Sequence, residues 1–428
     1  MPGGDGGMTL LITICFLVLM VSGSPLFVVI SAATIYCFYL LGIDLSVVVI
    51  EMYRLAASPM LIALLLFAFA GFVLAESKAS NRLVRLSTAL MGWAPGGLAI
   101  VSLITCAFFT ALTGASGVTI VALGGLMLPA LISDRYPERF SLGLLTTCGS
   151  LGLLFPPSLP LIIYAMVADI NIAQLFLAGV LPGIIMLILL SLYCMYQGIR
   201  SGSAGSHASF SIHEIMAALR ESVWEVFLPV VVLGGIFSGY LALSEAATIT
   251  ALYVLLVEVF IQREVKLKDL PIVIMKTVVM VGAIVVILGA ALAFNGFLID
   301  QEVPNKILDF MRYHVESKFT FLIILNIFLL GVGCVLNIFS ALVIVVPLII
   351  PIAKSYDVNL LHLGIIFLTN LQIGYSLPPI GMDLLIASLR FDKSIIYLYI
   401  ASLPFIAILL LTLILITFFP SLSLLLIK

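Results

Sequence analysis

The stretch "GSLGLLFPPSLPLIIY" (Gly149–Tyr164) lies in a segment apolar enough for a membrane helix, yet it holds two glycines and three prolines. A proline inside a helix removes a backbone donor and clashes with the carbonyl one turn earlier, and the residue before it avoids helical geometry. Pro156-Pro157 should therefore interrupt the helix. Backbone groups freed at membrane depth survive only where protein buries them or they line a wet cavity. We therefore expect a buried break with a function.

The composition around this stretch sets the class of protein. The chain has 428 residues, of which 63% are hydrophobic and 9% are charged, against about 25% charged residues in soluble domains. Apolar runs of 18 or more residues recur from Met8 onward, and each can cross about 30 Å of hydrocarbon. No alternation of polarity in segments of about ten residues, the mark of a membrane β-barrel, is visible. The prediction is an all-α polytopic membrane protein in a lipid bilayer.

Several other classes of protein find no support. A net charge of −2 offers no basic surface for nucleic acid. The segment "MPGGDGG" has no positive n-region, so Thr9–Ser22 is expected to begin the first helix and not to be a cleaved signal peptide. The six cysteines are scattered without a C-x-x-C pair, which favours buried thiols over a metal or redox site. No H-E-x-x-H, G-x-S-x-G or nucleotide-binding P-loop motif occurs, and an enzyme is not expected.

The break has a counterpart in the second half of the chain. "LTGASGV" (Leu112–Val118) precedes Pro156-Pro157, and "GVGCVLNIFSA" (Gly331–Ala341) precedes Pro378-Pro379. The separation is 43 positions from Thr113 to the first pair and 41 positions from Asn337 to the second. Paired interruptions in corresponding places mark the binding sites of transporters built from inverted repeats.

We therefore predict two inverted structural repeats, residues 1–205 and 206–428, joined in the Ser- and Gly-rich region of Gly198–Glu221. Each repeat should contain a broken helix, near 113–117 and 331–341. Each should also contain a re-entrant Pro-Pro hairpin, at 141–168 and 360–389, because the pieces on either side of the prolines are about half a membrane thick. Helix N-termini there favour an anion, and unwound carbonyls can bind a cation such as Na⁺.

Neutral oxygens near these breaks come from Thr113, Ser116, Ser158, Asn337 and Ser376. Asp383 is an intramembrane carboxylate and hence a functional candidate. It either couples transport to a cation or starts a helix, facing water or the hairpin's own N–H groups. His362 is expected to be a cap or surface residue and not a proton carrier. Asp44–Ala57 and Val303–Glu316 carry enough charge to be interfacial helices.

With these motifs, the chain resembles the large membrane subunit of TRAP (tripartite ATP-independent periplasmic) transporters. The resemblance extends from about Thr9 to Ile416. It rests on six blocks in order: "FFTALTGASGVTIVALGGLMLPAL", "GSLGLLFPPSLPLIIY", "FLAGVLPG", "GGIFSGYLALSEAATITALY", "VPLIIPIAKSYDVNLLHLGII" and "TNLQIGYSLPPIGMDLLIAS".

The resemblance implies an elevator-type protein of the bacterial inner membrane, in which a transport domain slides against a scaffold. Uptake is driven by sodium and not ATP, and no cofactor is needed besides Na⁺ as the coupling ion. The substrate is a small organic acid, such as a dicarboxylate or sialic acid, delivered by a periplasmic substrate-binding protein. A small four-helix membrane subunit completes the complex.

The resemblance also implies sites. The first sodium site maps to Thr113, Ala115, Ser116, Gly149, Gly152, Phe155 and Pro157, and the second to Gly333, Asn337, Gly374 and Pro378. Substrate lies between the two hairpin tips, where the candidates are Thr113, Ser116, Ser158, Tyr375, Ser376 and Asp383.

The chain also departs from the family pattern. Ala115 replaces a serine, so that any ligand there is its carbonyl, and Asn337 stands where an aspartate is expected. Asp383 stands where an asparagine is commoner and places a carboxylate close by. A channel, or a one-component ion-coupled anion transporter of similar design, remains an alternative. The acid carried stays open.

Overall fold

The computed structural model describes residues 26–202, 211–315 and 317–427, and within them every regular element is a helix. Eight of these helices are long and apolar enough to cross a membrane, or up to nine if one bent pair is a single span. The predicted all-α class is confirmed. The predicted start of the first helix at Thr9–Ser22 lies outside the described residues.

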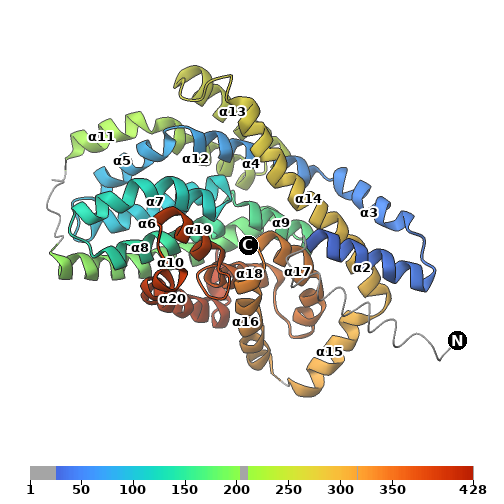
Figure 1. Ribbon diagram of the computed structural model, residues 1–428. Helices are drawn as coiled ribbons and strands as arrows, with labels where there is room; N and C mark the ends of the chain where they lie inside the picture. Colours follow the sequence, from blue (N-terminus) through green and yellow to red (C-terminus); the bar gives the residue numbers. More distant parts are fainter. Residues whose placement is uncertain (1–25, 203–210, 316, 428) are drawn as a thin grey trace.

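The two halves present similar elements in the same order: a long apolar helix, a short amphipathic helix, two helices joined at a tight break, a span interrupted by Pro-Pro, and a second long helix (Figure 1). The first half contains α2 (Leu26–Leu41), α3 (Ser46–Ala56), α4 (Pro59–Glu76), α5 (Ala79–Met91), α6 (Gly97–Thr113), α7 (Ser116–Ser133), α8 (Glu138–Cys148), the 3₁₀ turn η1 (Leu151–Leu154), α9 (Leu159–Ala168) and α10 (Ile172–Ser201).

The second half begins with three helices, α11 to α13, that precede the elements it shares with the first half. It contains α11 (Ile212–Glu221), α12 (Val223–Phe237), α13 (Leu243–Leu255), the π-helical turn η2 (Leu256–Ile261), α14 (Leu270–Asp300), α15 (Val303–His314), α16 (Lys318–Val335), α17 (Ile338–Ser355), α18 (Leu360–Gly374), α19 (Met382–Phe391), α20 (Ile395–Phe418) and α21 (Ser421–Leu424). The two charged segments expected to be interfacial form the separate short helices α3 and α15.

Side-chain caps place several helix starts. The Ser58 hydroxyl accepts the N–H of Met60 at the start of α4, and Pro59 occupies the first turn, where its missing N–H costs nothing. The side chain of Asn337 accepts the Ser340 N–H at 2.9 Å and so caps α17. Asn337 therefore fixes a break in the second half and is also one of the predicted sodium ligands.

The helices α6 and α7 form a hairpin. The helices pack against each other, and the reversal occurs at Gly114, whose φ of 67° favours glycine. Their far ends also meet, because Gly96 and the hydroxyl of Tyr136 both lie against Gly198 of α10. The chain thus enters and leaves on one side, with its tip at Gly114-Ala115.

The α16–α17 pair repeats this arrangement. Lys318, which begins α16, donates to the carbonyl of Asp357 just beyond α17 at 2.7 Å. The rings of Phe321 and Tyr356 stack with centroids 4.6 Å apart. The open ends of the pair lie together, and its tip is at Leu336-Asn337.

The Pro-Pro segments follow a different path from the predicted one. The pieces Glu138–Leu154 and Leu159–Ala168 are bent by only 45°, so the chain continues across the molecule. Tyr164 of α9 donates to the carbonyl of Leu360 at 2.9 Å, which places the start of α18 beside α9. Lys393 after α19 pairs with Glu138 at the start of α8 at 2.8 Å. The second Pro-Pro span therefore also runs from one end to the other.

The predicted re-entrant hairpins at 141–168 and 360–389 are thus wrong in their path. Each is an interrupted span with an unwound centre, and the segments near 113–117 and 331–341, predicted as broken helices, are the tips of the true hairpins. We call α6–α9 and α16–α19 the core, and α2–α5 and α11–α15 the frame. The core and the frame approach closely at Gly71 of α4, where a Cβ would come within 2.7 Å of the Thr113 Cα.

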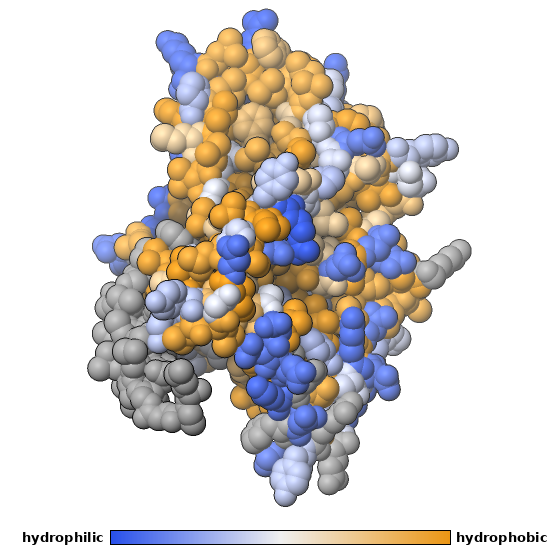
Figure 2. Space-filling view, turned by 90° about the vertical axis from the view of Figure 1, so that its right-hand side faces the viewer, coloured by the Kyte–Doolittle hydropathy of each residue, from blue (hydrophilic) through white to orange (hydrophobic). Residues whose placement is uncertain are grey.

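The outer surface suits a bilayer. Figure 2 shows hydrophobic side chains over much of one face, with hydrophilic side chains gathered in separate clusters. Exposed large apolar residues occur along the long helices, including Val230, Val279 and Ile327. Such a surface would be unstable in water and is expected for helices that face lipid.

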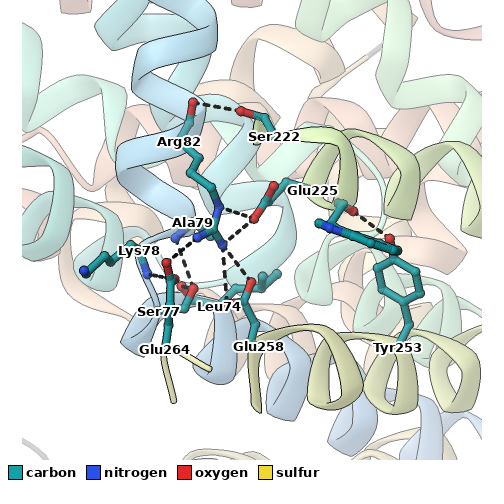
Figure 3. A network of polar contacts seen from close by, with 11 residues as sticks. Leu74, Ser77, Lys78, Ala79, Arg82, Ser222, Glu225, Tyr253, Glu258 and Glu264 are labelled. Carbon is teal, nitrogen blue, oxygen red and sulfur yellow. Dashed lines mark hydrogen bonds and ion pairs between the residues drawn. The ribbon is translucent and has the colours of Figure 1, made fainter. Parts of the chain in front are cut away.

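Within the frame, a buried ion cluster joins the short helix α5 to α12 and to the turn after α13 (Figure 3). Arg82 is 5% exposed, and its Nε lies 2.7 Å from Glu225 of α12. Its other nitrogens lie 3.1 Å from Glu258, in the π-helical turn η2, and 2.6 Å from Glu264. Ser222 donates to the Arg82 carbonyl at 3.0 Å. The cluster sets one positive charge against three carboxylates.

Burial disfavours the charged guanidinium of Arg82, but hydrogen bonds to Glu225 and Glu264 outweigh it and raise the pKa of this group. Arg82 therefore stays charged at every pH of interest. Since Glu225 and Glu258 are almost fully buried, the arginine is what makes their burial tolerable.

His362 is another buried polar residue, and here the prediction of a cap or surface position is wrong. It is 1% exposed, and its ring nitrogens lie 3.2 Å from the Ser423 hydroxyl and 3.3 Å from the Thr417 carbonyl. The reason is tertiary: α20 and α21 fold back over the start of α18.

Candidate functional site

A cavity of about 700 Å³ lies where the tips of both hairpins meet the frame. The first tip contributes Gly114–Val118 and the second contributes Asn337–Phe339. From the frame side come Phe72, Glu76 and Lys276. The cavity has the size usual for small-molecule sites, and it joins four segments that are far apart in sequence.

Lys276 is the one basic side chain among the described residues that line this cavity, and it pairs with Glu76. Both are about half exposed. The pair joins α14 to α4 at the edge of an otherwise mostly apolar cavity. An anion entering from that side would meet a cation whose charge is already partly compensated.

The first hairpin tip lies directly against the first break. The hydroxyl of Thr110 donates to the carbonyl of Gly149 at 2.7 Å and is 2.6 Å from the hydroxyl of Thr119. A Cβ on Gly149 would lie 3.2 Å from the Ser116 carbonyl. The two threonines, one on each arm of the hairpin, thus hold the unwound segment at the tip.

Gly152 brings the break still closer to α6. A Cβ on this residue would lie 2.2 Å from the Ala107 carbonyl oxygen and 2.4 Å from the Ala111 nitrogen. Both are backbone atoms that cannot move aside. The absence of a side chain is therefore a steric requirement at this position.

The second tip meets the second break in a corresponding way. A Cβ on Gly374 would lie 2.6 Å from both Cα and C of Gly333. The N–H of Ile338 donates to the hydroxyl of Tyr375, which ties the start of α17 to the break. The predicted partners Gly333, Asn337 and Gly374 are thus brought together.

The structure separates the predicted substrate residues into two groups. Ser116 and Tyr375 line the cavity. Thr113, Ser158, Ser376 and Asp383 are buried behind it, with exposures of 3%, 0%, 0% and 0%. The Thr113 hydroxyl donates to the Phe109 carbonyl at 2.9 Å, and the hydroxyls of Ser158 and Ser376 have no hydrogen-bond partner among the described residues.

The predicted sodium ligands are likewise placed at the breaks. Ala115 and Asn337 line the cavity, and Gly149, Gly152, Gly333 and Gly374 are buried beneath it. The prolines differ: Pro157 is buried, whereas Pro378 is exposed. Each set thus has one member at the cavity and its glycines buried beneath it, and the second set is more open at its proline.

Asp383 is the buried carboxylate at the breaks. It lies in the first turn of α19, and its N–H donates to the Tyr375 carbonyl at 3.1 Å. The polar side chains that act on its carboxylate are the hydroxyls of Ser116 and Ser150, both in the first half of the chain. Of the alternatives that the sequence leaves open for Asp383, a position facing water is wrong, because the residue is fully buried.

Sequence reasoning missed several of these residues. Thr110 and Thr119 carried no signal beyond their hydroxyls, which also suit ordinary helix interiors. Ser150 lies inside the opening stretch beside Gly149 and could have been chosen with it. Lys276 was detectable as a lysine six residues inside a long apolar helix, a position where charge usually has a role.

Comparison with known proteins gives a consistent result. The family model for "Tripartite ATP-independent periplasmic transporter, DctM component" matches residues 13–422. The C4-dicarboxylate TRAP transporter large permease protein DctM of Rhodobacter capsulatus is 29% identical over 421 residues, 95% of this chain and 96% of that protein. The ectoine/5-hydroxyectoine TRAP transporter large permease protein UehC of Ruegeria pomeroyi is 29% identical over 417 residues, 96% of this chain and 97% of that protein.

Among solved structures, the fold is similar to that of the Alcanivorax borkumensis YdaH transporter. The TM-score is 0.62, the sequence identity is 15%, and the match covers 89% of this chain and 88% of that one. At this identity the likeness concerns the fold alone.

Proposed function

The chain belongs to the DctM component family of tripartite ATP-independent periplasmic transporters, and from this premise we propose that it imports an organic acid in symport with Na⁺. Membership makes it a large permease subunit and a multi-pass protein of the bacterial inner membrane, not an enzyme. The observation that carries the proposal is the cavity of about 700 Å³ at which both hairpin tips meet.

The substrate is proposed to bind in this cavity, against Ser116 and Tyr375. Two helices begin at its wall, α7 at Ser116 and α17 at Ile338, and helix N-termini favour anions. Lys276 can supply a positive charge from the frame side when it exchanges Glu76 for the substrate. These features support a carboxylate or a similar anionic group as the part of the substrate that is recognised.

Sodium is proposed to bind in two places, one at each break. The first site uses oxygens around Thr113, Ala115, Gly149, Gly152, Phe155 and Pro157, and the second uses those around Gly333, Asn337, Gly374 and Pro378. Tight glycine contacts support this assignment, because they bring backbone carbonyls of two segments together without side chains between them.

Movement is proposed to follow the elevator scheme, with the core sliding against the frame. Support comes from the way the core is tied to itself: Tyr164 bonds to Leu360, and Lys393 pairs with Glu138, across the two halves. At Gly71 the frame presents bare backbone to the first tip. At this one point no side chain of α4 stands between the frame and the first tip.

The partners proposed are a small four-helix membrane subunit and a periplasmic substrate-binding protein. The tripartite nature of the family supports both. The relatives are named for C4-dicarboxylates and for ectoine and 5-hydroxyectoine. A thermal-shift screen of the binding protein encoded with this chain, using organic acids and ectoine, would choose among these.

The test is uptake of the radiolabelled substrate found by that screen into proteoliposomes that contain this chain and the small subunit. Uptake should require an inward Na⁺ gradient and added binding protein. Unchanged uptake after K⁺ replaces Na⁺ would disprove sodium coupling. Unchanged uptake without the binding protein would instead favour a one-component transporter.

A further inference from the structure

A charged loop at residues 262–269 joins two helices of the frame that are long and apolar enough to cross a membrane, Leu243–Ile261 and Leu270–Asp300. A short connection between two spans lies at the surface of the bilayer, at the level of the lipid headgroups. The span α4 ends at the same place, because the N–H of Lys78, just beyond α4, donates to Glu264 of the loop at 2.8 Å. The charges of this loop therefore face headgroups, water or a partner protein.

The structure sorts the charges of this loop by sign. Glu264 turns inward, where its Oε1 lies 2.6 Å from Nη1 of Arg82 and its Oε2 accepts the Lys78 N–H (Figure 3). The three basic side chains of the loop share an exposed position and are Arg263, Lys266 and Lys268. Within the described part of the chain none of these three forms an ion pair. The loop thus presents cations outward and hides a carboxylate.

Two more charges belong to this surface. Lys78 lies beside the loop, and its exposed side chain points away from the buried ion cluster around Arg82 (Figure 3). Asp269 is the exposed acid of the loop, and it forms no ion pair with a described residue. Lys78 and the three cations of the loop therefore outnumber the one exposed carboxylate.

The loop has a fixed shape that keeps the cations outside. The N–H groups of Glu264 and Val265 both donate to the Glu258 carbonyl, at 2.9 and 3.3 Å. The Asp269 N–H donates to the Lys266 carbonyl at 2.9 Å. Val265 is 3% exposed and anchors the middle of the loop. Because Glu264 and Val265 are held inward, the basic side chains on either side of them remain at the surface.

Apolar side chains flank these cations. Phe260 and Ile261 end the preceding span, and both are exposed. Leu267 lies between Lys266 and Lys268 and is 63% exposed. At a bilayer surface, a leucine in this position enters the hydrocarbon, while the lysine stems cover apolar surface and carry their charges to the headgroups. This alternation of cations and exposed apolar side chains favours a lipid over an acidic protein surface.

We propose that this end of the frame binds the headgroups of anionic phospholipids through four cations: Lys78, Arg263, Lys266 and Lys268. Basic clusters beside membrane spans attract anionic lipids in this way. The inference goes beyond the proposed transport function and is independent of the sodium and substrate sites. Through Glu264 the loop is bonded to Arg82 and so to the ion cluster that joins α5, α12 and η2. Lipid bound to the loop should therefore stabilise the frame.

The test is thermal stabilisation of the purified complex of this chain with its small subunit by short-chain phosphatidylglycerol. Phosphatidylcholine of the same chain length is the comparison without net charge. A ligand that binds only the folded state raises its melting temperature with concentration. We expect phosphatidylglycerol to act at lower concentration than phosphatidylcholine, and this difference to shrink at high salt. Glycerol 3-phosphate, the arm for a free phosphate, should have no effect.

Lys266→Gln/Lys268→Gln removes two of the four cations and keeps two long polar side chains. It should raise the phosphatidylglycerol midpoint by about 25-fold, since each cation near a membrane surface contributes about fivefold to binding. Lys266→Glu/Lys268→Glu should remove the difference between the two lipids.

The matched control is Arg54→Gln/Arg85→Gln. It also removes two exposed cations from the frame, but each of these is already paired with a glutamate. The control should keep the phosphatidylglycerol midpoint of the unmodified complex. All variants should copurify with the small subunit.

Each other outcome overturns the proposal. Equal stabilisation by the two lipids would show that charge plays no part, and an equal effect of glycerol 3-phosphate would show a site for free phosphate. An unchanged midpoint in Lys266→Gln/Lys268→Gln, or an equal shift in the control, would place the anionic lipid elsewhere. If the lysine variant lost the small subunit and kept its lipid response, the surface would bind that protein and not lipid.

Discussion

Arg82 and Asp383 are both buried charges in an apolar protein, and their surroundings are opposite. Arg82 lies within hydrogen-bond distance of three glutamates, whereas no basic side chain among the described residues acts on Asp383. A paired charge has a fixed geometry and resists movement. An unpaired one is stable only when something binds it. The comparison indicates that this chain uses opposite charges to fix its frame and leaves Asp383, at the second break, without one.

The largest effect is expected from breaking the paired cluster. Arg82→Met would leave Glu225 and Glu258 buried without their cation, and breaking a buried ion pair in this way costs about 3–5 kcal/mol. We expect a large fall in the melting temperature of the purified complex, together with poor expression. Fluorescence-detected size exclusion after heating would measure this fall.

Arg85 is the control for that prediction, since it lies on the same helix and pairs with Glu214 and Glu221 but is half exposed. Exposed pairs contribute little, so Arg85→Met should leave the melting temperature nearly unchanged. If Arg82→Met instead kept the melting temperature and abolished Na⁺-dependent uptake, the cluster would belong to the transport machinery and the comparison would fail.

The next effect concerns the breaks, where glycine and not charge sets the geometry. Gly152→Leu would force backbone atoms of α6 away from the first break, since even a Cβ would lie 2.2 Å from the Ala107 carbonyl. Uptake should fall by about 100-fold or more, the scale expected when a site is displaced by an ångström. Copurification with the small subunit should be retained.

A matched pair in the second half shows whether the two breaks are equivalent. Gly374→Ala would meet the Gly333 backbone at 2.6 Å and should also impair uptake severely. Gly331→Ala, two residues from Gly333 on the same helix, would meet nothing within 4 Å and should transport normally. Normal uptake by Gly152→Leu would show that the first sodium site lies elsewhere.

These residues also show how far the sequence alone could lead. Proline chemistry is local, so both breaks and their correspondence were predictable. The path of the chain was not, because α8 and α9, with 11 and 10 residues, suit either a hairpin or the two halves of one span. Conversely, α6 and α7 have 17 and 18 residues, about the length needed to cross a membrane. Their length therefore gave no indication that they form a hairpin.

Polar contacts between residues far apart in the chain also could not be predicted from the sequence. Arg82 meets its three partners across 143 to 182 positions of sequence, and no local pattern encodes such a distance. A signal did exist, because Glu225 and Glu258 interrupt apolar helices, as Asp383 does. Sequence could mark each buried carboxylate as unusual. Only packing could show that Arg82 balances two of them and that Asp383 has no basic partner among the described residues.

The smallest effect is expected at an exposed pair between the two interrupted spans. Lys393 lies 2.8 Å from Glu138, and the hydrogen bond and charge of that carboxylate raise the lysine pKa. A raised pKa means that the pair stabilises the folded state fully below the lysine's pKa in the unfolded chain, about 10.4. This stabilisation is lost as the pH rises through the higher pKa of the folded state. The complex with Lys393→Met should therefore have a slightly lower melting temperature than the unmodified complex from pH 6 to 9. This difference in melting temperature should vanish above about pH 11. A difference that stayed constant to high pH would show that the methylene groups of Lys393, and not its charge, join the spans.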